Sequence, residues 1–289
     1  MVREAKEDKV FRWISTGFML IFAIIALLPL VSTVAMSFSS RAAAEMNAVI
    51  LWPVNFTLAS WNYIIKDVAL WRSFLVTILS TACTVVLSLL VTSLMAYPLS
   101  KTYFKAGGIL MTLVVFTMIF KAPTVPYFLT LKTLGLYNSP VVLVLPHIFS
   151  AYNLAIMRTS FKAFPSEIEE AAVIDGCGRA QVLFRIVLPS SKATLMTIGL
   201  FYGVVAWNQF QHPMMFITDT KYYPLQMRVR QLINSGEDIL DNIFNISVNY
   251  NEATLSAATV VFSMLPIIAV YPVLQKYFVK GAMLGSVKG

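Results

Sequence analysis

The sequence predicts an all-α integral membrane protein with six transmembrane helices, and three observations support this prediction. Of the 289 residues, 58% are hydrophobic and only 12% are charged, whereas a soluble domain carries about 25% charged residues. The mean hydropathy of +0.73 agrees with a membrane protein. Six stretches with few or no charges are also long enough to cross a bilayer as helices, which takes about 20 apolar residues.

The stretches between charged residues place the spans in order along the chain. The expected spans are 14–38, 73–98, 106–131, 137–157, 193–218 and 254–275. The apolar run after Arg12 is too long for the core of a signal peptide, so we expect it to stay in the chain. The prediction is a single transmembrane domain over 1–289, with a polar loop over 158–192 and a second loop over 219–252.

Lysine and arginine counts orient the six spans. Both ends, the link at 99–105 and the loop 158–192 fall on one side and hold fourteen of the 22 Lys and Arg residues. Because cytoplasmic loops carry the excess of positive charge, we expect both termini and 158–192 in the cytoplasm, and 219–252 outside. The basic residues form no dense stripe along which a nucleic-acid backbone would bind. The net charge of +8 therefore predicts topology and no nucleic-acid partner.

Prolines are frequent in the expected spans. They are Pro29, Pro98, Pro123, Pro126, Pro146, Pro213, Pro266 and Pro272. An interior proline removes a backbone donor and kinks or breaks a helix, and in lipid the freed carbonyls need partners in protein or water. Such a bundle suits a transporter that rocks between two states, although kinked helices also occur in static membrane scaffolds.

The polar loop 158–192 is expected to begin with a short helix. Ser166 and Glu169 have the spacing of a capping box, in which each side chain accepts from the other's backbone N–H. Acidic residues in this first turn complement the helix dipole. Gly176 or Gly178 would end the helix, because glycine adopts a positive φ without strain.

A second short helix is expected over about 179–187. Val182, Leu183 and Ile186 would form its apolar face, and Pro189 would end it. The two helices form a compact pair. Because they are short and polar, we expect them to lie along the membrane surface.

The same loop carries a motif that resembles a known family. A Glu-Ala-Ala triplet, a glycine after three further residues and an Ile-x-Leu-Pro end match the EAA loop of binding-protein-dependent ABC importer permeases. The matching residues are Glu170, Ala171, Ala172, Gly176, Ile186, Leu188 and Pro189. An amphipathic surface helix would explain the capping residues but not this complete spacing.

The resemblance extends over nearly the whole chain. Further similar stretches are Pro123–Pro126, Leu134–Asn138, Trp207–Pro213, Tyr223–Leu225 and Lys276–Gly289. They are similar to MalG-like permease subunits of oligosaccharide ABC importers, and among these to the shorter permease of alginate-type importers. The resemblance implies the type I ABC importer permease fold with a cytoplasmic coupling-helix loop.

The resemblance also implies a function and partners. The chain would form, with a second homologous permease, the pathway through the bacterial inner membrane for an oligosaccharide delivered by an extracytoplasmic solute-binding protein. The basic bias weakly favours an acidic, alginate-like sugar. Two separate ATPase subunits would bind ATP and Mg. The chain itself would be no enzyme and need no cofactor, and it contains no Gly-x-x-x-x-Gly-Lys-Ser/Thr phosphate loop.

Two regions are implied to contact the ATPase subunits. The coupling residues would be Glu169, Glu170, Ala171, Ala172, Asp175, Gly176, Ile186, Leu188 and Pro189. The C-terminal contacts would be Gly285, Ser286, Val287, Lys288 and Gly289. Glu170 would anchor the loop on a basic or amide group of the ATPase, and Gly176 would permit the tight turn.

Candidates for the sugar pathway are Lys121, Tyr152, Trp207, Asn208 and Gln209. A lysine inside a hydrophobic stretch is a functional candidate and could balance the charge of an acidic sugar, or it reaches the outer interface or pairs within the bundle. The other four could stack on or hydrogen-bond a sugar; aromatic belts and interhelical hydrogen bonds explain them equally well. His147 and His212 have no partner at ligand spacing, so no catalytic or metal site is expected.

Two further alternatives remain open from the sequence. A secondary transporter or channel subunit would work without an ATPase, but the six expected spans contain no acidic residue for a proton relay or ion site. The segment 232–252 is longer than is usual in the family. It would either contact the solute-binding protein or be a neutral insertion in a surface loop.

Overall fold

The computed structural model describes residues 6–120, 122–234 and 250–286, and these residues form helices and connecting turns without a β-strand. This confirms the predicted all-α class. By internal contacts the chain divides into two compact units. The first comprises Met1–Leu70 and Val229–Leu265, and the second comprises Trp71–Arg228 and Pro266–Gly289.

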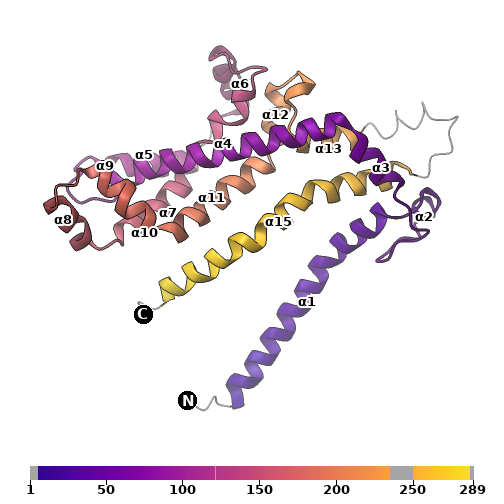
Figure 1. The fold of residues 1–289 in the computed structure, drawn as a ribbon, viewed down its shortest axis with the longest axis horizontal. Helices are drawn as coiled ribbons and strands as arrows, with labels where there is room; N and C mark the ends of the chain where they lie inside the picture. The colour runs from indigo at the N-terminus through magenta and orange to yellow at the C-terminus, as the bar shows by residue number, and fades with distance from the viewer. Residues whose placement is uncertain (1–5, 121, 235–249, 287–289) are drawn as a thin grey trace. The chain divides into compact units, whose positions relative to one another are not determined.

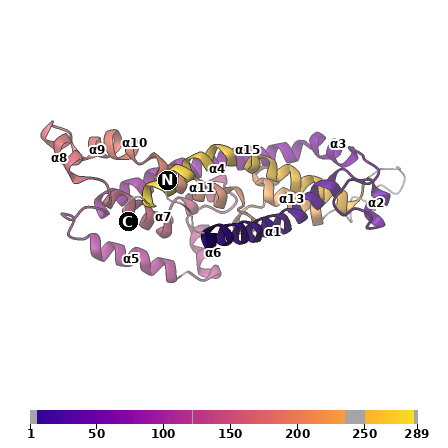
Figure 2. The same cartoon turned by 90° about the horizontal axis from the view of Figure 1, so that it is seen from below.

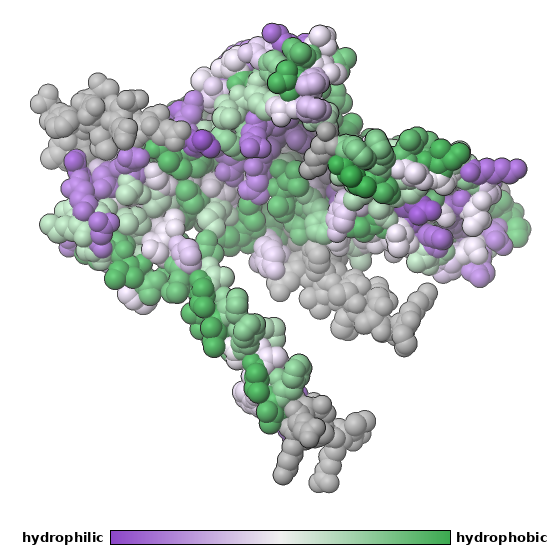
Figure 3. All heavy atoms as spheres, turned by 180° about the vertical axis from the view of Figure 1, so that it is seen from behind, coloured by the Kyte–Doolittle hydropathy of each residue, from purple (hydrophilic) through white to green (hydrophobic). Residues whose placement is uncertain are grey.

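Three helices are individually long and apolar enough to cross a membrane (Figure 1). They are α1 (Lys6–Ser37), α4 (Val68–Leu99) and α15 (Glu252–Ser286). Prolines occur inside all three, yet each helix continues past them. Large hydrophobic side chains are exposed along α1, and many of them lie on the face seen in Figure 3, as lipid contact or a protein partner in the membrane requires.

Three further apolar stretches are pairs of helices with a bend between them, and counting each pair as one span gives up to six spans. The first pair is α5 (Gly107–Ile119) with α6 (Thr124–Thr133). The second joins the 3₁₀ turns η1 (Pro140–Leu143) and η2 (Leu145–His147) to α7 (Ala151–Lys162). The third joins the stretch Arg179–Ser190 to α11 (Lys192–Trp207).

Three of the predicted spans, 106–131, 137–157 and 193–218, are not continuous helices, and proline explains the breaks in the first and the last. In 106–131, α5 ends at Ile119, and in 193–218, α11 ends at Trp207 before α12 (Gln211–Phe216) begins. A proline ring clashes with the carbonyl of the residue four positions earlier. A helix through Pro123 or Pro213 would therefore clash at Ile119 or Gln209. The breaks agree with the expectation that interior prolines kink or break these spans.

The second unit is held together by a polar stripe along α4. Its buried members are Ser73, Thr77, Ser80, Thr84, Ser88 and Thr92. The Thr77 hydroxyl accepts from the Leu225 N–H at 2.7 Å, and the Thr92 and Tyr202 hydroxyls lie 2.8 Å apart. Small residues let apolar helices approach closely, and their hydroxyls hydrogen-bond across the contact. The stripe thus fixes how α4 packs against its neighbours.

The first unit contains two short helices, α2 (Arg41–Glu45) and α3 (Ala59–Lys66). The Ser60 hydroxyl donates to the Thr254 hydroxyl at 3.1 Å, and the Tyr63 and Tyr250 rings lie 5.3 Å apart. These contacts join α3 to the beginning of α15.

The predicted loop 219–252 is partly helical. It contains the 3₁₀ turn η4 (Thr220–Tyr222) and α13 (Leu225–Asn234). Most of the lengthened segment 232–252 lies outside the described residues.

The polar loop 158–192 folds at the end of α4 that leads into α5, as Figures 1 and 2 both show. It contains α8 (Ser166–Ile174), α9 (Arg179–Val182), a π-helical turn η3 (Leu183–Val187) and α10 (Leu188–Ser190). Hydrophilic side chains gather at this end of the unit (Figure 3).

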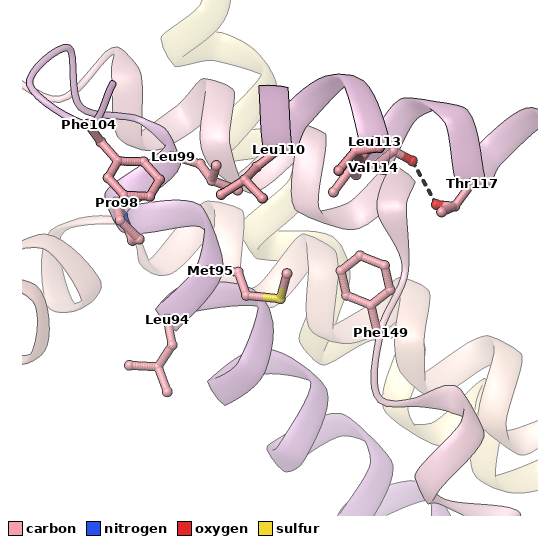
Figure 4. A pocket seen from close by; sticks show the side chains of 10 residues that line it. All are labelled: Leu94, Met95, Pro98, Leu99, Phe104, Leu110, Leu113, Val114, Thr117 and Phe149. Carbon is pink, nitrogen blue, oxygen red and sulfur yellow. Dashed lines mark hydrogen bonds between the residues drawn. The ribbon is translucent and has the colours of Figure 1, made fainter. Parts of the chain in front are cut away.

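A cavity of about 420 Å³ lies between α4 and α5 near the same end (Figure 4). Its lining residues are Leu94, Met95, Pro98, Leu99, Phe104, Leu110, Leu113, Val114, Thr117 and Phe149. The Thr117 hydroxyl donates to the Val114 carbonyl at 2.7 Å. This lining offers hydrocarbon rather than polar partners, so it does not suit a sugar.

Candidate coupling site

The first helix of the loop starts differently from the sequence prediction. Pro165 is the N-cap of α8, Ser166 is its first residue, and no side chain caps the start. The expected capping box between Ser166 and Glu169 is therefore absent. The Glu169 carboxylate binds Tyr97 and Lys101 instead.

The end of α8 agrees with the prediction that a glycine stops the helix. Gly176 has a φ of +85°. Its N–H donates to the Val173 carbonyl at 3.0 Å, and the Cys177 N–H donates to the Ala172 carbonyl at 2.9 Å. These two bonds form a Schellman motif, which satisfies the last carbonyls of the helix. The turn is thereby closed by backbone bonds alone.

The second helix of the loop is longer than predicted. It is helical from Arg179 to Ser190, and Pro189 lies within its last segment rather than after it. The Gly178 N–H donates to the Gln181 side chain at 3.0 Å, which caps the start. The π turn η3 directly precedes the proline segment. A wider turn there accommodates a proline whose ring would clash in a regular α-helix.

The underside of the helix pair is apolar and packs against the helical bundle. Ala172, Val182, Leu183 and Val187 belong to one buried cluster with residues of α4, α7 and α11. Of the predicted site residues, Ile186 and Leu188 pack against this cluster as partly buried side chains. Phe161 has no exposed surface and lies in the same cluster. The pair is thus attached firmly to the second unit.

Glu169 faces inward, unlike the other acidic residues of the loop. It is the only charged residue among the buried ones of the described chain, with 9% of its surface exposed. The Tyr97 hydroxyl donates to its carboxylate at 3.2 Å, and the Lys101 ammonium group forms a short ion pair with it. The Lys101 nitrogen also lies 4.8 Å from the centre of the Tyr97 ring. We call these three residues the Glu169 clasp.

Two arginines add further contacts between the loop and the link after α4. The Arg179 guanidinium lies 4.0 Å from the centre of the Tyr103 ring. Arg158 Nε donates to the Leu99 carbonyl at 2.8 Å, which satisfies a carbonyl at the end of α4. Cation–π contacts and charge-assisted hydrogen bonds of this kind hold the loop against the end of α4 and also fix its orientation there.

The outer face of the helix pair is exposed. Of the predicted coupling residues, Glu170, Ala171, Asp175, Gly176 and Pro189 lie on it. Beside them Ile168, Val173 and Ile174 expose 48%, 54% and 85% of their surface. Apolar side chains around acidic groups form a face suited to binding a protein.

The predicted C-terminal contacts fall at the end of α15. Gly285 and Ser286 are its last described residues, and Val287, Lys288 and Gly289 lie outside the described chain. Their contact with an ATPase stays a prediction.

The candidate pathway residues do not form one site in the structure. Trp207 and Gln209 are buried, whereas Asn208 and Tyr152 are exposed. Gln209 Nε2 donates to the Leu143 carbonyl at 3.3 Å, and the Asn208 amide donates to the Val204 carbonyl at 2.9 Å. Lys121 lies outside the described residues. A role for these five in sugar passage stays a prediction.

The structure pairs the two histidines, which the sequence did not predict. The His147 and His212 rings lie 4.8 Å apart, and His212 Nε2 lies 2.8 Å from the Tyr127 hydroxyl. The rings come from η2 and α12, which are far apart along the chain. The Tyr127 and Phe216 rings also contact His212, with centroids 5.7 and 4.7 Å away, and no local motif indicates this packing.

The helical fold and the EAA loop define an integral membrane permease of an ABC importer. The chain belongs to the family of binding-protein-dependent transport system inner membrane components, whose family model matches residues 102–283. Members of this family are transport subunits rather than enzymes and have no cofactor of their own.

Individual relatives cover almost the whole chain. The polygalacturonan/rhamnogalacturonan transport system permease protein YtcP of Bacillus subtilis is 36% identical over 98% of this chain and 100% of that protein. The arabinooligosaccharides transport system permease protein AraQ of Halalkalibacterium halodurans is 27% identical over 98% of this chain and 99% of that protein.

A solved structure is similar over nearly the same length. It is a chain in the crystal structure of a bacterial ABC transporter involved in the import of the acidic polysaccharide alginate. The TM-score is 0.88 at 31% identity, and the match covers 96% of this chain and 100% of that chain. This likeness and the family match confirm the fold predicted from the sequence.

Proposed function

We propose that the chain is the permease subunit that passes the movement of an ATPase pair to the transport pathway of an acidic-oligosaccharide importer. The observation that carries this proposal is the helix pair of 158–192. Its underside is packed into the second unit, while its outer face presents Glu170 and exposed apolar side chains. A rigid pair attached on one side and open on the other is suited to transmit a displacement.

The proposed partners follow from two features: the sequence contains no phosphate loop for ATP, and the outer face of the helix pair is exposed. ATP binding would close two cytoplasmic ATPase subunits, and the outer face of the helix pair would move with them. A second permease would complete the pathway, because six helices are too few to enclose an oligosaccharide. A solute-binding protein would deliver the sugar from outside. The chain would lie in the bacterial inner membrane, with both termini in the cytoplasm.

The proposed substrate is an acidic oligosaccharide. Two similar proteins support this class: one acts in a polygalacturonan/rhamnogalacturonan transport system, and one belongs to an importer of the acidic polysaccharide alginate. Uronic acid units carry a carboxylate at neutral pH. The excess of Lys and Arg over Asp and Glu, 22 against 14, is favourable for attracting such anions.

A panel of sugars tests the substrate class. The permease is reconstituted in proteoliposomes with its partner permease, the ATPase subunits and the binding protein. We expect acidic oligosaccharides to stimulate ATP hydrolysis and uptake by about tenfold or more over neutral oligosaccharides of the same length, which corresponds to about 1.4 kcal/mol of discrimination. Equal stimulation by the neutral set would contradict the acidic substrate, and uptake without ATP would favour a secondary transporter.

A further inference from the structure

We infer that the Glu169 clasp is the positioning contact that fixes α8 to the end of α4 and passes the movement of the coupling helices into the bundle. This inference rests on the proposed function and assigns a role to Glu169, Lys101 and Tyr97. Glu169 would act inside the chain, while Glu170 beside it faces the ATPase.

The burial of Glu169 gives the first argument. A carboxylate with 9% exposure loses most of its hydration, and this loss is tolerated only when the charge is paired and hydrogen-bonded. Lys101 supplies the charge and Tyr97 supplies a hydroxyl donor. Both partners are themselves largely buried, since the Lys101 side chain exposes 13% and Tyr97 exposes 8%. Removal of Lys101 would leave the Glu169 charge uncompensated, and removal of the Tyr97 hydroxyl would take a donor from it, so the three residues act as a unit.

The direction of the contact gives the second argument. The Arg179 and Arg158 contacts belong to α9 and α7; α8 itself is otherwise attached through Ala172 in the apolar cluster, and apolar contact is non-directional. A helix seated on apolar side chains alone can slide or tilt at low cost. An ion pair with a second hydrogen bond has defined geometry and is best attested as a device that fixes register. The clasp therefore sets where α8 lies on α4.

The position of the partners gives the third argument. Tyr97 belongs to the last turn of α4, and Lys101 follows that helix directly, with its N–H donating to the Pro98 carbonyl at 3.1 Å. From there α4 runs for 32 residues as one helix. Along the way Thr92 contacts Tyr202 of α11, and the Tyr202 hydroxyl accepts from the Ser150 N–H at 3.1 Å. A displacement of α8 is thus passed through the helix α4 to hydrogen bonds with α11 and Ser150.

The test uses the assembled complex and separates coupling from assembly. For Glu169→Gln and Lys101→Met, we expect the ATPase subunits to co-purify in normal amount and ATP hydrolysis to continue. Sugar uptake per ATP hydrolysed should fall about tenfold, within the 5–150-fold range typical of coupling between sites. Tyr97→Phe, which keeps the ring but removes the donor, should cause a smaller loss.

A charge exchange and a matched control make the result specific. Lys101→Glu alone and Glu169→Lys alone should each lower the uptake per ATP. The double variant restores opposite charges and should recover a large part of that loss. Lys105→Met removes an exposed lysine from the same link and should leave the ratio unchanged.

Two outcomes would overturn the inference. In one, Glu169→Gln keeps the wild-type uptake per ATP in an assembled complex. In the other, it loses the ATPase subunits, as expected for a contact with the partner rather than within the chain. Failure of the proposed function itself would show differently, because the wild-type complex would then import no sugar or hold no ATPase.

Discussion

Glu170→Lys is expected to abolish ATP-driven uptake while the permease remains inserted in the membrane. Glu170 is exposed on the outer face of α8, so the substitution disturbs no buried contact of the chain. A reversed charge at a docking interface costs about 2–5 kcal/mol, or about 30-fold or more in affinity for the partner. The measurement is uptake in membrane vesicles, together with the amount of ATPase that co-purifies with the permease.

The control for this substitution is Glu167→Lys. Glu167 is another exposed acid of the same helix and lies in its first turn, so the change in net charge is identical. Its reversal should cost only the weak favourable interaction with the helix dipole, about 0.3–1 kcal/mol. Normal uptake and ATPase binding in Glu170→Lys would show that this residue is no anchor.

Phe161→Ala is expected to have the largest effect on stability. Phe161 is fully buried in the cluster that attaches the helix pair to α4, α7 and α11. Truncation of a buried phenylalanine costs about 3–5 kcal/mol, because the lost contacts leave a cavity. For a chain of this size we expect the midpoint of thermal unfolding of the detergent-solubilised complex to fall by about 10 °C.

Phe184→Ala is the matched control for the loss of a ring. Phe184 lies in the same loop but exposes 47% of its surface, and exposed substitutions usually change stability by about 0.5 kcal/mol or less. Equal melting temperatures for Phe161→Ala and the wild type would mean that the cluster around Phe161 does not hold the helix pair.

The sequence was most informative where structure depends on local chemistry. Hydropathy alone predicts the all-α membrane class, because burying a helix in lipid requires a long apolar segment. Gly176 ends α8 as predicted, since the positive φ of +85° is a property of one residue and its two neighbouring peptides. The same is true of the apolar underside of the pair, where Val182 and Leu183 are buried.

Contacts between distant residues could not be predicted in this way. Glu169 was expected to cap its own helix, but it binds Lys101 and Tyr97, which lie 68 and 72 residues away. A local cap and a distant ion pair compete for the same carboxylate, and packing of α8 against α4 decides between them. The His147–His212 pair arises for the same reason.

The sequence predicts that prolines kink or break the spans, but not which of the two happens at each proline. In the expected span 193–218 the structure shows a break near Pro213, since α11 ends at Trp207 and α12 starts anew at Gln211. As third residue of α12, Pro213 needs no backbone donor, because the first N–H groups of a helix have no partner within it. Pro189 shows the opposite behaviour, since the preceding π turn allows the helix to continue past it.

The central claim is that the outer face of the helix pair binds an ATPase subunit, and cross-linking tests it most directly. A photo-reactive amino acid is placed at Ile174, which exposes 85% of its surface, and, as a control, at Thr220 in the loop expected outside. After irradiation of the assembled complex, we predict a covalent adduct of the ATPase with the Ile174 variant and none with the Thr220 variant. An adduct of Ile174 with the solute-binding protein, or with no ATPase subunit, would contradict the claim.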